Sequence, residues 1–88
     1  MEIGISSSFK RAFKKRLLHD KKLERLFWKK LQVFANNPYE PSLRTHKLSG
    51  ELEGLWSFSL NYEIRIIFKF LDENRVLLID IGSHEEVY

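Results

Sequence analysis

Six polar residues stand where the apolar pattern of this chain breaks or ends, and their types suit proton transfer at a phosphate. They are His46, Lys47, Arg65, His84, Glu85 and Tyr88. An unperturbed imidazole has a pKa of about 6.5, so a histidine can donate or accept a proton at cellular pH. A guanidinium can hold a phosphate through two parallel hydrogen bonds, and a tyrosine ring can stack on a nucleobase.

RNA cleavage is the reaction that these residue types suit. The 2′-hydroxyl of RNA is its own nucleophile, so the reaction needs a base, an acid for the leaving 5′-oxygen, and cations that stabilise the phosphorane. It requires no metal or other cofactor, and it would leave a 2′,3′-cyclic phosphate and a 5′-hydroxyl. The chain shows no cysteine, no glycine-rich phosphate loop, no histidine pair at helical spacing and no Gly-x-Ser-x-Gly elbow.

Each candidate also has a purely structural interpretation. Arg65 interrupts an apolar strand, so it must point away from the buried face that its apolar neighbours define. We expect its guanidinium on the exposed side of the sheet, where the alternative is an ordinary surface arginine. The alternative for His46 and His84 is a solvated surface position, and Tyr88 is a terminal residue that can fray.

Charge is distributed unevenly along the chain. Residues 1–30 carry ten Lys or Arg and three Asp or Glu, a net charge of +7, and the remaining residues sum to −4. Such a basic half suits a polyanion such as RNA, although a solvated helix face is the alternative. The residues that we expect to contact RNA are Lys10, Arg11, Lys14, Lys15, Lys21, Lys22 and Lys47.

The first half of the chain predicts a short strand followed by two helices. Residues 2–6 alternate between polar and apolar, as in a strand. From Phe9 the apolar residues recur every three or four positions, which predicts a helix capped by Ser6 to Ser8. After a weak break at His19-Asp20, a second helix runs to Asn36-Asn37-Pro38, because proline disfavours helix in the residue before it.

The second half predicts strands only. Residues 39–45 read as an extended connector and residues 49–54 as a turn-rich loop. Strands follow over residues 56–62, with one buried face, over 64–70, and over 76–81, which is apolar enough to lie centrally in a sheet. The order β-α-α-β-β-β predicts one α+β domain over residues 1–88, with two helices packed on an antiparallel sheet.

The second half also resembles a known family. The ordered segments are His46-Lys47-Leu48-Ser49-Gly50, Gly54-Leu55-Trp56-Ser57, residues 62–68 and residues 80–88. Together they resemble the RelE/ParE toxins, and most nearly the YafQ-like ribonucleases. The combination of an Arg-apolar-apolar-aromatic strand with a C-terminal Gly-x-His-x-x-x-aromatic is fairly specific to that family. Residues 1–45 match it only in general arrangement, as a short strand followed by a basic helical pair.

That resemblance implies roles for particular residues. His46 and His84 match catalytic histidines, Tyr88 takes the place of a terminal aromatic, and Arg65 matches an arginine that holds the scissile phosphate. This chain departs from the YafQ-like pattern because Ser59 replaces a second strand histidine and Glu63 replaces an aspartate. Glu63 could substitute for that acid.

The resemblance also implies the setting. We expect a type II toxin that cuts messenger RNA on the ribosome, contacts ribosomal RNA through its basic helices, and forms a hetero-oligomer with an antitoxin. Two alternatives remain open, a ParE-like poison of DNA gyrase and a binding module without catalysis. The composition, with no signal peptide and no long apolar run, predicts a cytoplasmic protein with no membrane contact.

Overall fold

The computed structural model describes residues 1–87, and the side chains of residues 1–86. Within this part of the chain, one five-stranded sheet has the order β1-β5-β4-β3-β2. Its strands are β1 (Glu2–Ile5), β2 (His46–Lys47), β3 (Trp56–Ser59), β4 (Ile64–Asp72) and β5 (Arg75–Ser83). The helices are α1 (Ser7–Arg16), α2 (Lys21–Asn36) and α3 (His84–Val87), and 3-10 turns span Pro41–Leu43 and Gly50–Leu52.

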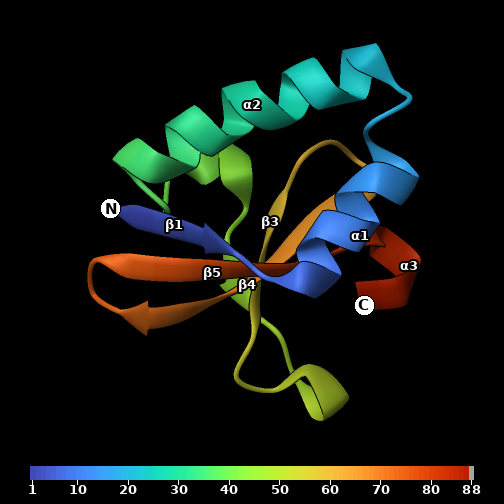
Figure 1. Cartoon of the computed structure of the whole chain (residues 1–88). Helices are drawn as coiled ribbons and strands as arrows, with labels where there is room; N and C mark the ends of the chain where they lie inside the picture. The colour runs from blue at the N-terminus through green and yellow to red at the C-terminus, as the bar shows by residue number, and fades with distance from the viewer. Residues whose placement is uncertain (88) are drawn as a thin grey trace.

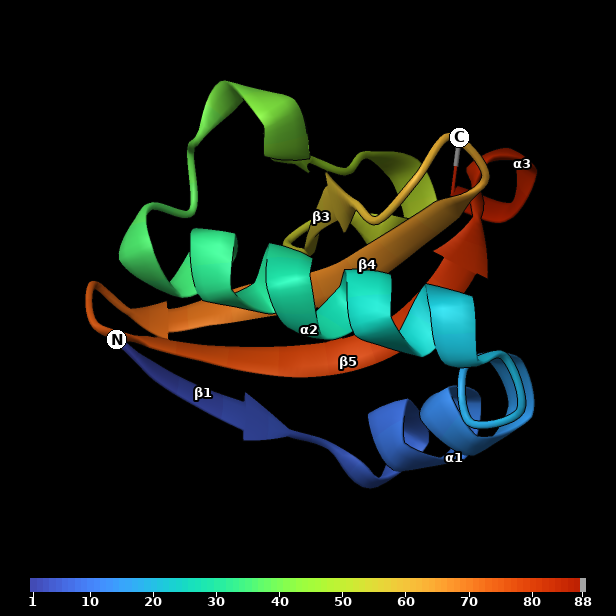
Figure 2. The same cartoon turned by 90° about the horizontal axis from the view of Figure 1, so that it is seen from above.

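The predicted α+β class and the order of the predicted elements are confirmed, and β2 and α3 are additions. The prediction of a purely antiparallel sheet is wrong, because β1 pairs in parallel with β5 while the other pairs are antiparallel. The reason is visible in the path of the chain, since β1 leads into α1 at the same end of the sheet at which β5 leads into α3 (Figures 1 and 2).

Local capping explains where the two long helices begin. The Ser6 hydroxyl accepts the backbone N–H of Phe9 at 3.0 Å, and the Asp20 carboxylate accepts that of Leu23 at 3.0 Å. Each bond satisfies an N–H group that has no partner inside its helix. The break that His19-Asp20 indicated in the sequence is therefore the start of α2.

One face of the sheet lies under α2, which runs roughly along the direction of the long strand β5 (Figures 1 and 2). Phe34 of α2 stacks on Phe58 at a centroid distance of 4.6 Å and meets Phe68 edge-on at 4.9 Å. All three side chains are fully buried. Burying a side chain of this size contributes about 1.5 to 3 kcal/mol, so this face carries much of the stability.

Two predictions for the middle of the chain are wrong. The strand from Trp56 has both faces buried, since Ser57 and Ser59 are only 0% and 9% exposed. The two serines are small and lie beside larger side chains of the neighbouring strands, since Ser57 lies between His46 and Ile67 and Ser59 lies opposite Arg65. The expected extended connector contains the 3-10 turn Pro41–Leu43, which folds Leu43 into the core.

No helix within residues 1–87 is both long enough and apolar enough to cross a membrane.

Candidate functional site

Cross-strand pairing places several candidate residues in two rows on the sheet face that α2 leaves uncovered. The first row, from β2 to β5, is His46, Ser57, Ile67 and Asp80. The second row is Ser59, Arg65 and Gly82. Opposed residues of an antiparallel ladder share a face, and rows two residues apart are separated by about 6 to 7 Å. The pairing therefore puts His46 and Arg65 on one surface, in adjacent rows.

Arg65 points away from α2 as predicted, but the prediction that its guanidinium lies on an exposed surface is wrong. Only 6% of the residue is exposed. Its Nη1 donates to the carbonyl oxygens of Asn61 at 2.6 Å, Tyr62 at 3.0 Å and Ile64 at 3.3 Å. These carbonyl groups compensate the burial of the charge, because the turn between β3 and β4 curls back over the strand. Arg65 therefore braces this turn.

The same turn receives the start of α3. The backbone N–H of His84 donates to the carbonyl oxygen of Glu63 at 2.7 Å, and the His84 ring lies edge-on to that of Tyr62, with centroids 6.0 Å apart. The Asn61 side-chain oxygen accepts the N–H groups of Glu63 and Ile64 at 2.9 and 2.8 Å, which fixes the turn. Glu63 and His84 are thus held side by side.

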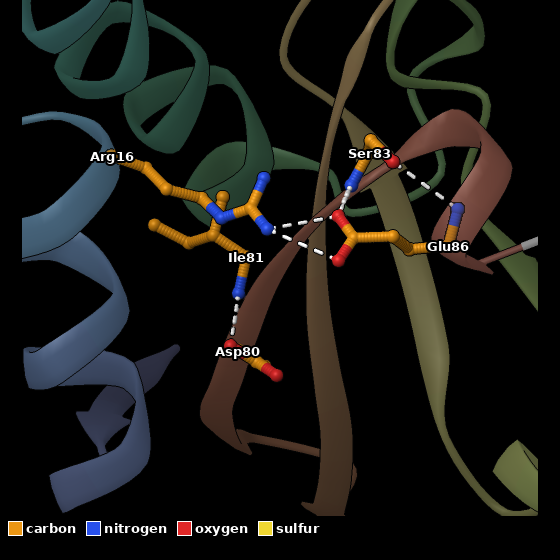
Figure 3. A network of polar contacts seen from close by, with 5 residues as sticks. All are labelled: Arg16, Asp80, Ile81, Ser83 and Glu86. Atoms are coloured by element: carbon orange, nitrogen blue, oxygen red, sulfur yellow. Dashed lines mark hydrogen bonds and ion pairs between the residues drawn. The ribbon is translucent and has the colours of Figure 1, made fainter.

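A polar network holds α3 against the end of α1 (Figure 3). The Ser83 N–H donates to the Glu86 carboxylate at 2.8 Å, and the Glu86 N–H donates to the Ser83 hydroxyl at 3.2 Å. These reciprocal bonds form a capping box. Arg16 donates to both carboxylate oxygens of Glu86, at 2.9 and 3.2 Å. Figure 3 shows the two side chains pointing toward each other across the end of β5.

The network has two consequences. The hydrogen bonds from the backbone and hydroxyl of Ser83, followed by the nearby charge of Arg16, lower the pKa of the Glu86 carboxyl. In addition, a four-residue helix has almost no stability of its own, so α3 depends on such anchors. His84 is the first residue of α3, and its position therefore depends on Arg16 and Glu86.

His46 is oriented from the opposite side of the site. Its Nδ1 donates to the carbonyl oxygen of Arg44 at 2.8 Å. Because a carbonyl oxygen only accepts, Nδ1 carries the proton and Nε2 is the basic nitrogen of the neutral ring. Arg44 has a φ of 52°, in the left-handed region that few non-glycine residues adopt. The chain therefore holds an unusual backbone conformation directly before His46.

Two further predicted residues fall outside this cluster. Lys47 neighbours His46, but it pairs with Trp56 and so lies on the other face, with its Nζ 5.6 Å from the centre of the Trp56 ring. Tyr88 lies outside the described residues. The structure thus separates Lys47 from the two rows.

The basic residues of α1 divide between two sides of that helix. Arg11, Lys15 and Arg16 line a cleft of about 520 Å³ whose other walls include Ile67 and Asp80 of the uncovered face. Lys10 and Lys14 instead border an apolar groove of about 480 Å³ between α1, α2 and β1. Lys21 and Lys22 are exposed in the first turn of α2. Only the first group adjoins the rows of candidate residues.

Sequence reasoning missed Ser83, Glu86 and Arg16. The first two could have been found, because Ser83-x-x-Glu86 has the spacing of a capping box. The pairing of Arg16 with Glu86 joins residues 70 positions apart and leaves no local signal.

One protein family matches the chain along its whole length. The model of the YafQ family, described as bacterial toxins of type II toxin-antitoxin systems, matches residues 1–88. No curated protein matches. YafQ from Escherichia coli BL21(DE3) is 18% identical with a TM-score of 0.75, and the match covers 99% of this chain and 97% of that one.

Two other solved structures have similar folds. A YoeB/ParE toxin from Agrobacterium tumefaciens is 16% identical with a TM-score of 0.77, over 96% of this chain and 99% of that one. A chain of the YoeB-YefM complex from Staphylococcus aureus is 22% identical with a TM-score of 0.74, over 96% and 97%. Because all three structures are less than 25% identical to this chain, their similarity establishes the fold and nothing further.

Proposed function

Because the chain belongs to the YafQ family of bacterial type II toxin-antitoxin toxins, we propose that it is an endoribonuclease that cuts messenger RNA on the ribosome. The observation that carries the proposal is the placing of His46, Arg65 and His84 around the uncovered sheet face, with basic side chains of α1 beside it. Proton-transfer groups beside a cationic cleft are what cleavage through the 2′-hydroxyl needs.

The two histidines divide the proton transfers. His46, with its basic Nε2, removes the proton of the 2′-hydroxyl, which attacks the adjacent phosphorus. His84 protonates the departing 5′-oxygen, so the products are a 2′,3′-cyclic phosphate and a 5′-hydroxyl. The buried charge of Arg65 favours the negative phosphorane, and the backbone hydrogen bond between His84 and Glu63 keeps these two residues beside each other at the site.

The substrate strand lies in the cleft between α1 and the sheet. Arg11 and Lys15 supply positive charge there, while Asp80 and the Arg16–Glu86 pair limit the net charge. Lys21, Lys22 and Lys47 lie beyond the cleft and contribute to the long-range attraction of ribosomal RNA.

The partner is a cognate antitoxin, and it covers the apolar groove between α1, α2 and β1. Ile5, Leu18 and Trp28 border this groove and are 48%, 46% and 52% exposed. Lys10 and Lys14 flank it, so an acidic amphipathic segment fits both its surface and its charge. The YoeB-YefM complex, whose toxin has the same fold, supports a toxin-antitoxin hetero-oligomer. Trp28→Glu should abolish copurification with the antitoxin while RNA cleavage persists.

Gyrase poisoning is not favoured, since the family match is to YafQ. A binding module without catalysis predicts that His84→Ala changes nothing. Induced expression separates these functions. Growth arrest with new 5′-hydroxyl ends in translated RNA, both lost in His84→Ala, supports the ribonuclease, whereas arrest with intact RNA points to another target.

The roles of the histidines have their own test. A 5′-bridging sulfur at the scissile phosphate makes a leaving group that needs little protonation. This substrate should restore cleavage by His84→Ala, which lacks the acid, but not by His46→Ala, which lacks the base. Equal rescue of both variants, or of neither, would contradict the assignment.

A further inference from the structure

Asp80 places an exposed carboxylate in the cleft between α1 and the sheet, whose other charged groups mostly suit phosphate. Three cations line the same cleft, namely Arg11, Lys15 and Arg16. The other acidic residue of the lining, Glu86, is paired with Arg16. Within residues 1–86, Asp80 forms no ion pair, and its only hydrogen bond comes from the N–H of Ile81 at 2.8 Å. A carboxylate repels phosphate, so Asp80 suits a different part of an RNA strand.

An irregularity in β5 turns Asp80 toward this cleft. Ile67 of β4 pairs with Asp80. The next residue of β4, Phe68, pairs with Leu78, so Ile79 is an extra residue in β5. Strict alternation from Leu78, which is fully buried, would put Asp80 on the covered face of the sheet. The bulge shifts the alternation by one residue, and such bulges often re-aim a side chain beside an active site.

Two serines at the start of α1 hold this bulge in place. The hydroxyl groups of Ser8 and Ser6 donate to the carbonyl oxygen of Ile79 at 2.6 and 3.2 Å. Oδ1 of Asp80 accepts the Ile81 N–H, and Figure 3 shows the second carboxylate oxygen directed away from that bond. The carboxylate is therefore oriented by the backbone, and it keeps acceptor positions for a ligand.

The opposite wall of the cleft offers an apolar surface. Leu52, in the turn between β2 and β3, lines the cleft and is only half-buried. The flat face of a nucleobase can pack on such a side chain and remove apolar surface from water. The cleft has a volume of about 520 Å³, within the range of about 300 to 1,000 Å³ typical of small-molecule sites, so it can hold one nucleotide.

The proposed roles of the histidines indicate which side of the cut Asp80 faces. His84 follows β5 and protonates the 5′-oxygen, which belongs to the nucleotide on the 3′ side. His46 lies on β2 and serves the 2′-hydroxyl on the 5′ side. Asp80 is in the same row as His46 but three interstrand spacings away, about 14 Å at about 4.8 Å each, and it lies on β5. Asp80 therefore faces RNA on the 3′ side of the cut.

Resting on the ribonuclease proposal, we propose that the Asp80 carboxylate selects guanine at a nucleotide on the 3′ side of the cut. The Watson–Crick edge of guanine carries two neighbouring donors, N1–H and the 2-amino group, and an ionised carboxylate can accept from both. Adenine and cytosine present a donor beside an acceptor, and uracil presents a donor between two acceptors. Each of these three bases would set a lone pair against the carboxylate. Arg11 and Lys15 hold the phosphate of the selected nucleotide.

The first experiment titrates the folded chain with GMP, AMP, CMP and UMP and follows the backbone amide signal of Ile81 in NMR. This amide is hydrogen-bonded to the Asp80 carboxylate, so it reports directly on a bound base. We expect saturable shifts with GMP at an affinity on the order of ten-fold above that of the other nucleotides, as a bidentate contact provides. Asp80→Asn presents a donor beside an acceptor, so it should prefer AMP or CMP to GMP.

The matched control is Glu53→Gln. It removes the same charge from an exposed position next to Leu52 that does not line the cleft, and it should keep the preference for GMP. Equal affinities for the four nucleotides, absence of saturable shifts, or a preference for GMP that survives in Asp80→Asn would overturn the proposal. The same change of preference in Glu53→Gln would also overturn it, since net charge would then explain the effect.

The second experiment measures cleavage of ribosome-bound messages that differ in one nucleotide on the 3′ side of the cut. At the selected position, the wild-type chain should cut the guanine message fastest. Inosine, which lacks only the 2-amino group, should reduce kcat/KM on the order of ten-fold. Asp80→Asn should cut the guanine and inosine messages at similar rates, and those with adenine or cytosine faster.

The two proposals fail in different ways. If the wild-type chain cuts no message, the ribonuclease proposal is wrong, and the nucleotide titration, which needs no cleavage, still decides whether Asp80 selects guanine. If the wild-type chain and Asp80→Asn cut with the same base preference, the ribonuclease proposal stands and the role of Asp80 is overturned.

Discussion

The two faces of the sheet have different roles, since one forms the apolar core and the other carries polar side chains. Under α2, Phe34, Phe58 and Phe68 pack without a polar atom between them. On the other face the strands present serines, Arg65 and His46, and backbone carbonyl groups accept hydrogen bonds from the Arg65 guanidinium and the His46 ring. Packing on one face thus leaves the other face able to carry groups that would destabilise a core. The following predictions test this division.

The largest effect on stability is expected from the covered face. Phe34→Ala removes a ring that contacts two other buried rings, and it should lower the free energy of unfolding by about 3 to 5 kcal/mol. Urea unfolding of the purified chain measures this. Leu71→Ala, at an exposed position of β4, is the control and should cost far less. Similar losses in both variants would contradict the assignment of the core.

Arg65 should show an intermediate effect on stability, because its guanidinium also braces the β3–β4 turn. Arg65→Gln loses three hydrogen bonds to the β3–β4 turn and should cost about 1 to 3 kcal/mol in unfolding free energy. Lys69→Gln removes the same charge from an exposed position of β4 and should change stability little. An Arg65→Gln variant as stable as the control would show that the arginine does not brace the turn.

The contacts of Glu86 with Arg16 and Ser83, which hold α3 in place, should affect activity more than stability. Glu86→Gln weakens the contacts that hold α3 and should reduce kcat on the order of ten-fold, because a small displacement of a catalytic group is costly. KM should change little. Glu85→Gln is the control on the same helix. The double variant Arg16→Gln with Glu86→Gln should have a kcat no lower than that of the less active single variant, because both changes break the same ion pair. Multiplying effects would mean that Arg16 contacts RNA independently.

The smallest predicted effect is a pH dependence. The folded protein lowers the pKa of Glu86, so the contribution of this carboxylate to α3 docking is present above the unfolded pKa, about 4.3, and is lost as pH falls through the lowered value. The Ser83 amide signal in NMR should report that midpoint. Arg16→Gln should move the midpoint upward, since a positive charge beside the carboxylate is removed. An unchanged midpoint would contradict the ion pair.

Elements with a local signal were predictable from the sequence, and elements made by distant contacts were not. The periodicity of Phe9 to Leu17 and the break before Pro38 gave both long helices. In contrast, β2 has only two residues, and it forms because β3 offers it an edge. The parallel pairing of β1 with β5 likewise depends on where the chain returns.

The candidate site shows the same limit. His46 and His84 were selected from residue type, position and the family resemblance, and their catalytic roles stay a prediction. Strand pairing, which the sequence did not reveal, puts His46 one row from Arg65. The burial of Arg65 was not foreseen, because it arises from carbonyl groups of a turn whose path the strand pattern does not reveal. The alternation of side chains along the strand did correctly predict that Arg65 points away from the apolar face.

The most direct test of the central claim uses ribosome complexes carrying a messenger RNA with one 2′-deoxynucleotide on the 5′ side of the mapped cut. We predict that the wild-type chain cuts the all-ribose message in the presence of EDTA, leaves a 2′,3′-cyclic phosphate and a 5′-hydroxyl, and fails at the deoxy position. Cleavage that continues at that position, or products with a 5′-phosphate, would contradict attack by the 2′-hydroxyl.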